Sequence, residues 1–180
     1  LLTIKGPPSK MKIQKKERYF GIWINNKQIT YSNIPTLFFL SSSSKIEEIL
    51  PTSIQINDDL NFDKILNNKT FDQNFIFEND QSTWNKNFVR IKKKQLFYKE
   101  FEMKIFKDKL FQTSVYFPAT TSPGEYKVSV YHVRNKTIIS KEDKIINIEK
   151  AGIGNDIYNF ANSNSATYGF FTIVFAILSG

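Results

Sequence analysis

The feature that most constrains this chain is an uncharged apolar run at its end, residues 166–180. The run is shorter than the about 20 apolar residues that a helix needs to cross a hydrocarbon core of roughly 30 Å. Its large side chains leave no polar face for water, so we expect the truncated start of a transmembrane helix rather than a segment packed in a soluble core. The expected membrane residues are Tyr168, Phe170, Phe171, Ile173, Val174, Phe175, Ile177 and Leu178.

The chain before this run has the length of one domain, which we place at residues 1–150. Residues 151–165 contain Gly and Asn and are expected to form a juxtamembrane connector. Ile157, Phe160 and Ala161 would share one face of a helix there, which favours a short helix lying at the membrane interface. The alternative for this segment is a plain linker.

Short alternating segments separated by turn residues indicate an antiparallel β fold. Residues 19–24 are strand formers, and Asn25-Asn26 predicts a tight hairpin turn because Asn tolerates positive φ. Residues 134–136 predict a second turn, between a strand over residues 125–133 and returning segments over residues 137–140 and 144–150. Strands of this density, without strand-helix-strand alternation, are typical of a β-sandwich.

Two alternating stretches also predict which side chains face the core. Residues 110–118 would place on one face Phe111, Thr113, Val115 and Phe117. Residues 125–133 would bury Tyr126, Val128, Val130 and His132. These faces fit the inner sides of strands that pack in a sandwich.

A helical insertion is expected within about residues 71–103. Trp84, Phe88 and Ile91 recur at steps of three and four, which predicts an amphipathic helix over residues 81–98. A further helix-compatible segment covers residues 71–77, and a short helix is expected over residues 45–50. The fold class is therefore mainly β: an immunoglobulin-like antiparallel β-sandwich with a helical insertion and a truncated C-terminal transmembrane helix.

The residue inventory argues against an enzyme. The chain has no Cys and one His, His132, which excludes thiolate nucleophiles and His-based catalytic triads within it. The carboxylate pairs Glu47-Glu48 and Asp58-Asp59 are adjacent in sequence and do not converge on a substrate. We expect no catalytic residue, no cofactor-binding residue and no metal ligand.

The net charge of +8 raises an anionic membrane surface or a nucleic acid as a partner. Only three of the 25 basic residues are Arg, namely Arg18, Arg90 and Arg134. Nucleic-acid readers depend on Arg for bidentate contacts, so we expect no nucleic acid. Codon bias in an AT-rich genome is a second explanation for the many Lys residues.

Three segments resemble the alphaproteobacterial Alph_Pro_TM family of transmembrane proteins. They are residues 15–25 (KKERYFGIWIN), residues 110–128 with their Phe-Pro and Pro-Gly-Glu-Tyr-Lys-Val parts, and residues 157–169 leading into the apolar run. The resemblance implies a signal peptide and first strands ahead of Leu1, an extracytoplasmic domain, and one C-terminal helix in the bacterial inner membrane. The family carries no established activity, and its association with sulfite-exporter-like permeases implies an accessory subunit.

Together these observations predict a single-pass envelope protein whose bulk faces the periplasm and which has no enzymatic activity. Its expected partners are the lipid bilayer and a multi-span membrane permease. The expected contact residues are Lys15, Lys16, Arg18 and Trp23, with core packing as the alternative for Trp23. The other hypotheses are a membrane-tethered envelope enzyme or glycan-binding module, and a basic nucleic-acid-binding domain.

Overall fold

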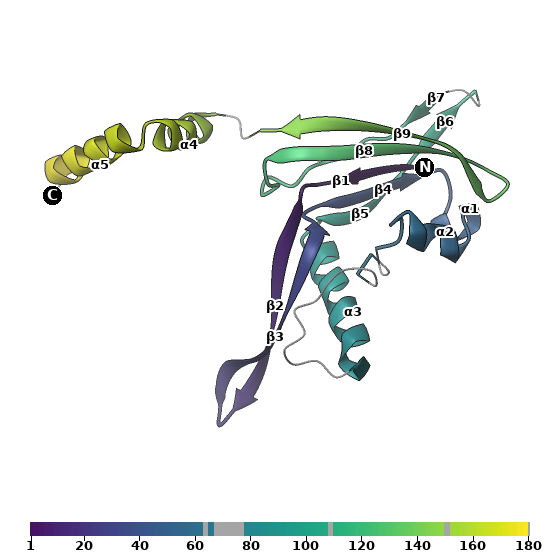
Figure 1. Cartoon of the computed structure of the whole chain (residues 1–180), viewed down its shortest axis with the longest axis horizontal. Coiled ribbons are helices and arrows are strands. Elements are labelled where there is room, and N and C mark those ends of the chain that lie inside the picture. Colours follow the sequence, from purple (N-terminus) through teal and green to yellow (C-terminus); the bar gives the residue numbers. More distant parts are fainter. Residues whose placement is uncertain (63–64, 67–77, 108–109, 150–151, 180) are drawn as a thin grey trace. The chain divides into compact units, whose positions relative to one another are not determined.

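The computed structural model describes residues 1–62, 65–66, 78–107, 110–149 and 152–179. The chain divides into two compact units, Leu1–Asn147 and Ile148–Gly180. The first unit holds the sheets and helices α1 to α3, and the second holds helices α4 and α5, as labelled in Figure 1. The helical segment predicted over residues 71–77 lies outside the described residues.

A five-stranded sheet in the order β5-β4-β1-β8-β9 forms the centre of the first unit. Strand β1 pairs antiparallel with β4 and β8, whereas β5 joins β4 in parallel. The strands are β1 (Leu2–Lys5), β4 (Phe38–Ser42), β5 (Tyr98–Glu102), β8 (Gly124–Arg134) and β9 (Thr137–Ile148).

Two antiparallel hairpins accompany this sheet. One joins β2 (Pro8–Tyr19) to β3 (Ile22–Pro35), and the other joins β6 (Lys104–Phe106) to β7 (Leu110–Gln112). The chain is thus mainly β with antiparallel sheets, as predicted, but an immunoglobulin-like sandwich is not confirmed. The predicted helical insertion contains α3 (Glu78–Lys94) and then ends in β5, which is a strand of the main sheet.

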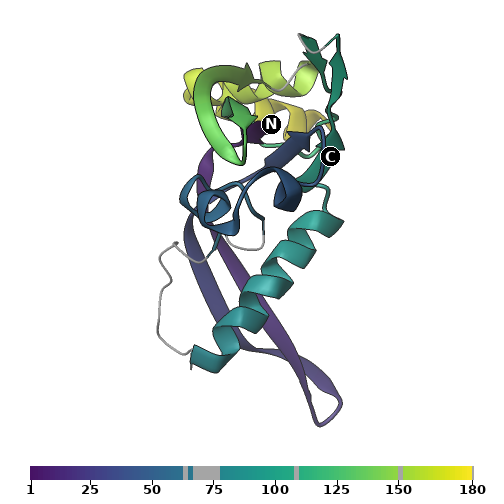
Figure 2. The same cartoon turned by 90° about the vertical axis from the view of Figure 1, so that its right-hand side faces the viewer.

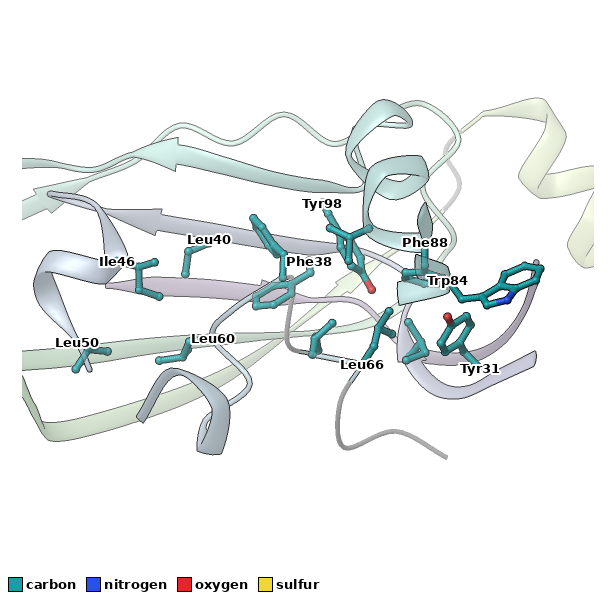
Figure 3. Close-up of a cluster of buried hydrophobic side chains, with 14 of the residues drawn as sticks. Tyr31, Phe38, Leu40, Ile46, Leu50, Leu60, Leu66, Trp84, Phe88 and Tyr98 are labelled. Atoms are coloured by element: carbon teal, nitrogen blue, oxygen red, sulfur yellow. The ribbon is translucent and has the colours of Figure 1, made fainter. Parts of the chain in front are cut away.

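Side chains of strand β4 alternate between its two faces, and other residues cover both faces. Phe38 and Leu40 belong to a cluster that also includes Ile46 of α1 (Ile46–Ile49), and Gln55 of α2 (Thr52–Asn57) is buried beside that helix. The Gln55 amide donates to the carbonyl oxygen of Leu50 at 2.8 Å, which satisfies a buried polar group. Figure 3 shows Phe38 and Tyr98 in the middle of this cluster.

The opposite face of β4 is covered by a second aromatic group. The Phe39 ring lies 5.0 Å from Phe101 and 5.4 Å from Phe117, and Phe117 lies 5.8 Å from Tyr126. Thr113, Val115 and Phe117 are partly buried, so the predicted alternation is confirmed for them, but Phe111 is exposed and β7 ends at Gln112.

The predicted burial of His132 is wrong. Tyr126 and His132 are both at even-numbered positions of β8, but Tyr126 is buried and His132 is exposed. Phe117 covers Tyr126, whereas the buried neighbour of His132 is Tyr131, which belongs to the cluster of Phe38. Val128 and Val130 are only partly buried, while Ser129 and Tyr131 of the opposite face are buried, so the buried side of β8 changes along the strand.

Helix α3 packs against the β2–β3 hairpin. The Tyr31 hydroxyl donates to Asn85 Oδ1 at 3.0 Å, and the Tyr31 ring lies 4.9 Å from Phe88. Trp84 and Phe88 are buried while Lys86 and Arg90 are exposed, as the helical periodicity predicts, but Ile91 of the predicted apolar face is exposed and the helix ends at Lys94. Figures 1 and 2 show the hairpin extending away from the five-stranded sheet and past α3.

Gly6 occupies the corner where the chain leaves the sheet for this hairpin. Its N–H donates to the carbonyl oxygen of Leu37 at 2.8 Å. A Cβ on Gly6 would lie 2.9 Å from Tyr126 Cε1 and 3.1 Å from the backbone nitrogen of Leu37, and would also clash with Thr36 Oγ1. Overpacked sites cost about 1–3 kcal/mol.

Gly6→Ala is therefore expected to lower the free energy of unfolding by about 1–3 kcal/mol, measured by urea denaturation of the full chain in mild detergent. Gly154→Ala is the matched control, because a Cβ at Gly154 would have nothing within 4 Å. Equal stability of the two variants would contradict the close packing at Gly6.

Candidate membrane- and partner-contact site

The β2–β3 hairpin turns at Phe20 and Gly21. Their φ angles are +48° and +86°, as a two-residue turn with positive φ at both central positions requires. The turn predicted at Asn25-Asn26 is wrong. Asn25 instead pairs with Lys16 inside the ladder, next to a register shift between Lys15 and Lys16, so these Asn residues accompany a β-bulge.

The tip of the hairpin, residues 19–24, carries a group of exposed apolar side chains. Phe20 is fully exposed, and the exposed fractions of Ile22 and Trp23 are 68% and 65%. Tyr19 and Ile24 are exposed as well. The core-packing alternative for Trp23 is thus wrong, since this side chain faces solvent.

Basic side chains lie directly behind the tip. Arg18 is the cross-strand partner of Trp23, and Arg18 Nε donates to the carbonyl oxygen of Gly21 at 3.4 Å. Lys15 Nζ lies 2.8 Å from Glu17 Oε1, on the other face of the ribbon. The structure thus brings Lys15, Lys16, Arg18 and Trp23 together on one exposed hairpin end.

Sequence reasoning missed the exposed residues Tyr19, Phe20, Ile22 and Ile24 as site residues. They are strand formers, so they were predicted to lie within one strand that leads to a turn at Asn25-Asn26. The available signal was Gly21, which favours a turn between the aromatic pair Tyr19-Phe20 and the apolar run over residues 22–24.

A groove of about 240 Å³ lies between the hairpin and α3. Trp84, Asn87 and Arg90 contribute from α3, while Lys15 and Lys27 contribute from the hairpin. The residues that line the groove supply cations, amides, one hydroxyl, one indole and two Ile side chains, and none of them is Asp or Glu. Such a lining fits an anionic or hydroxyl-rich ligand better than acid–base chemistry.

The first helix of the second unit is α4 (Ile153–Ser163), so the helix predicted within the connector is confirmed over this range. Asp156 in its first turn is favourably placed at the positive end of the helix dipole. Ile157, Tyr158 and Phe160 are exposed, and the Phe160 ring lies 6.4 Å from Tyr168 of the following helix.

Helix α5 (Ser165–Ser179) has no buried residue. Its apolar side chains point outward on all sides, with Val174 alone partly buried among those predicted to face the membrane. The exposed ones are Tyr168, Phe170, Phe171, Ile173, Phe175, Ile177 and Leu178. A helix that is apolar all round needs an apolar environment.

Among the described residues, no helix combines the length and the apolarity required to cross a membrane.

The groups considered for catalysis do not converge in the part of the chain that the structure describes. Glu47 and Glu48 are both exposed on α1, and no set of three His, Cys, Asp or Glu residues there could hold a metal ion. Lys127 Nζ lies 2.8 Å from Asp143 Oδ2, and this hydrogen bond lowers the pKa of the Asp143 carboxyl. The same hydrogen bond raises the pKa of Lys127, so this exposed pair is a surface ion pair.

A family model described as "Putative transmembrane protein (Alph_Pro_TM)" matches the chain over residues 1–180. The comparisons with curated proteins and with solved structures gave no match. Both units of the chain lie within the matched range.

Proposed function

The chain belongs to the Alph_Pro_TM family, and from this premise we propose that it is a single-pass, membrane-anchored envelope protein without enzymatic activity. In this proposal α5 lies in the bacterial inner membrane and the Leu1–Asn147 unit faces the periplasm. The protein acts through contacts, as an accessory subunit of a membrane transport complex.

The observation that carries this proposal is the exposure of α5 on every side. Seven of its large apolar side chains face outward in the isolated chain. Transferring such side chains from water to an apolar environment contributes about 1.5–3 kcal/mol each. Seven of them would contribute roughly 10–20 kcal/mol, which a lipid bilayer supplies without any protein partner.

The accessory role rests on the hairpin tip. Trp and Arg side chains dominate the energy of many contact surfaces, and here Trp23 and Arg18 are paired across the strands and exposed. Lys15 and Lys16 add positive charge beside them. These four residues are the contact residues of the proposal.

The test is a detergent pull-down of the full-length tagged protein from its native membranes, followed by mass spectrometry. Near-stoichiometric recovery of a multi-span permease is the expected result. Recovery from the membrane fraction without a partner would contradict the accessory role, and recovery from the soluble fraction would contradict the anchor.

The groove between the hairpin and α3 favours a glycan-binding module as a second candidate. Trp84, Asn87 and Arg90 provide the aromatic, amide and cationic groups that an acidic cell-wall glycan requires. Calorimetric titration with soluble cell-wall fragments tests it, because Arg90→Ala should weaken binding by tenfold or more. The expected loss follows from the about 1.5–3 kcal/mol of a charge-assisted hydrogen bond. Binding that is equally strong in this variant would remove the candidate.

A further inference from the structure

We propose that the hairpin tip, residues 19–24, docks on the surface of an anionic lipid bilayer. Its aromatic side chains would occupy the interfacial layer, and the basic side chains behind them would contact lipid phosphates. This inference rests on the proposed membrane anchor alone, and it assigns the hairpin tip to lipid where the accessory role assigns it to a permease.

The exposure of the tip is the first step of the argument. Phe20, Ile22 and Trp23 extend from the end of a ribbon formed by 12-residue and 14-residue strands, with Phe20 fully exposed. Contiguous exposed apolar groups mark interaction sites or membrane contacts in folded proteins. The apolar group is confined to the end of the ribbon, because Ile29 and Tyr31 nearer the sheet are buried.

The arrangement of side chains on the two faces favours a bilayer over a flat protein surface. Directly paired residues in a hairpin share a face, so Trp23 and Arg18 lie on one side. Tyr19 and Ile22 form the next pair and lie on the opposite side. A flat partner would cover one side only, whereas lipid surrounds an inserted tip and covers both.

The residue types match the layers of a membrane surface. Trp and Tyr concentrate at membrane–water interfaces, where their apolar rings and polar groups are both accommodated. Phe20 and Ile22 at the turn have no polar group and suit the deeper acyl boundary. Phe20 thus lies at the turn, Tyr19 and Ile22 form the first pair behind it, and Trp23 belongs to the next pair.

The charge of the hairpin end complements anionic lipid. Lys15, Lys16, Arg18 and Lys27 carry four positive charges, and Glu17 carries one negative charge that is already ion-paired with Lys15. At about 3.3 Å per residue, Arg18 lies roughly 7 Å and Lys16 roughly 13 Å behind Phe20 along the strand. These depths place their cationic groups near the phosphates when Phe20 reaches the acyl boundary.

Trp23 is a direct reporter of the tip. In a Trp84→Phe background of the full chain, Trp23 is the one remaining Trp. We would reconstitute this protein in nanodiscs with 30% phosphatidylglycerol or with phosphatidylcholine alone, and measure fluorescence quenching by brominated lipid and by aqueous acrylamide. The expected result in the anionic discs is a blue-shifted Trp23 emission, strong quenching by brominated lipid and protection from acrylamide.

Replacing basic residues by Ser tests whether their charge contributes to the binding of the tip to anionic lipid. A basic residue near an anionic surface contributes about five-fold to binding, so Lys16→Ser with Arg18→Ser is expected to reduce tip insertion by roughly 25-fold. Lys136→Asn, in the exposed turn between β8 and β9, is the matched control and should leave the quenching unchanged. The complementary single-Trp protein, Trp23→Phe, should show a Trp84 signal that brominated lipid does not alter.

Three outcomes would overturn the inference. Trp23 emission could remain that of a water-exposed indole in discs that contain the protein. Trp23 could be quenched equally in anionic and zwitterionic discs and in the doubly neutralised variant. Protection of Trp23 could also require co-reconstitution with a captured permease, which would identify a protein as the occupant. A chain that fails to enter discs at all would instead contradict the proposed anchor.

Discussion

Replacing Ile173 and Ile177 of α5 by Lys is expected to release the chain from native membranes into the soluble fraction. Both side chains are exposed in the chain itself, at 62% and 74%, so the substitutions remove no intramolecular packing. A Lys near the centre of a membrane helix costs about 2.5–3.5 kcal/mol. Two of them would shift the partition by roughly 5–7 kcal/mol, or about four orders of magnitude.

The measurement is flotation and alkaline-carbonate extraction of membranes that contain each variant. Ile139→Lys with Ile145→Lys is the matched control, since these Ile residues are exposed on β9 and the proposal places them in water. The control should stay with the membranes as the parent chain does. Carbonate-resistant retention of the α5 variant at the parent level would contradict a membrane location for this helix.

Periodic segments of the first unit could be predicted because burial imposes a period on their sequences. Trp84 and Phe88 are buried one turn apart, whereas Lys86 and Arg90 between and beyond them are exposed. The turn over residues 134–136 was predicted as well, and Asn135 and Lys136 have φ angles of +50° and +60°. In both cases the residue types within one short segment determine the secondary structure of that segment.

Pairing between distant segments could not be predicted in this way. Strand β5 lies parallel to β4, with Tyr98 opposite Phe38, although helices α1 to α3 separate them in sequence. An alternating pattern indicates a strand, but it does not indicate which other strand pairs with it. A two-sheet sandwich was therefore predicted for a region in which helices cover one face of the β4 strand.

Exposure of the hairpin tip could not be predicted from the sequence either. Trp23 and Ile24 are residue types that also occur in core strands. The sequence pattern indicates that they are hydrophobic, but it does not indicate which residues cover them. Lys15, Lys16, Arg18 and Trp23 were nevertheless predicted to be contact residues. The structure brings these residues together and exposes them, while their partner stays a prediction.

Phe38→Ala is expected to lower the free energy of unfolding by about 3–5 kcal/mol, because it removes a buried ring and leaves a cavity. The Phe38 side chain is fully buried, and its ring lies 4.8 Å from Phe62 and 6.0 Å from Tyr98. Lys5 Nζ lies 5.2 Å from the centre of the same ring and would lose that contact.

A loss of this size is a large part of the about 5–15 kcal/mol that stabilises a typical domain. The cluster around Phe38 joins the sheet to Trp84 and Phe88 of α3, so the hairpin should lose its support when the cluster opens. Urea denaturation in mild detergent, followed through Trp84 fluorescence in a Trp23→Phe background, measures the change. Phe20→Ala removes the same ring from the exposed turn and should change stability by less than about 0.5 kcal/mol. Comparable losses in the two variants would contradict the assignment of Phe38, rather than the hairpin tip, to the core.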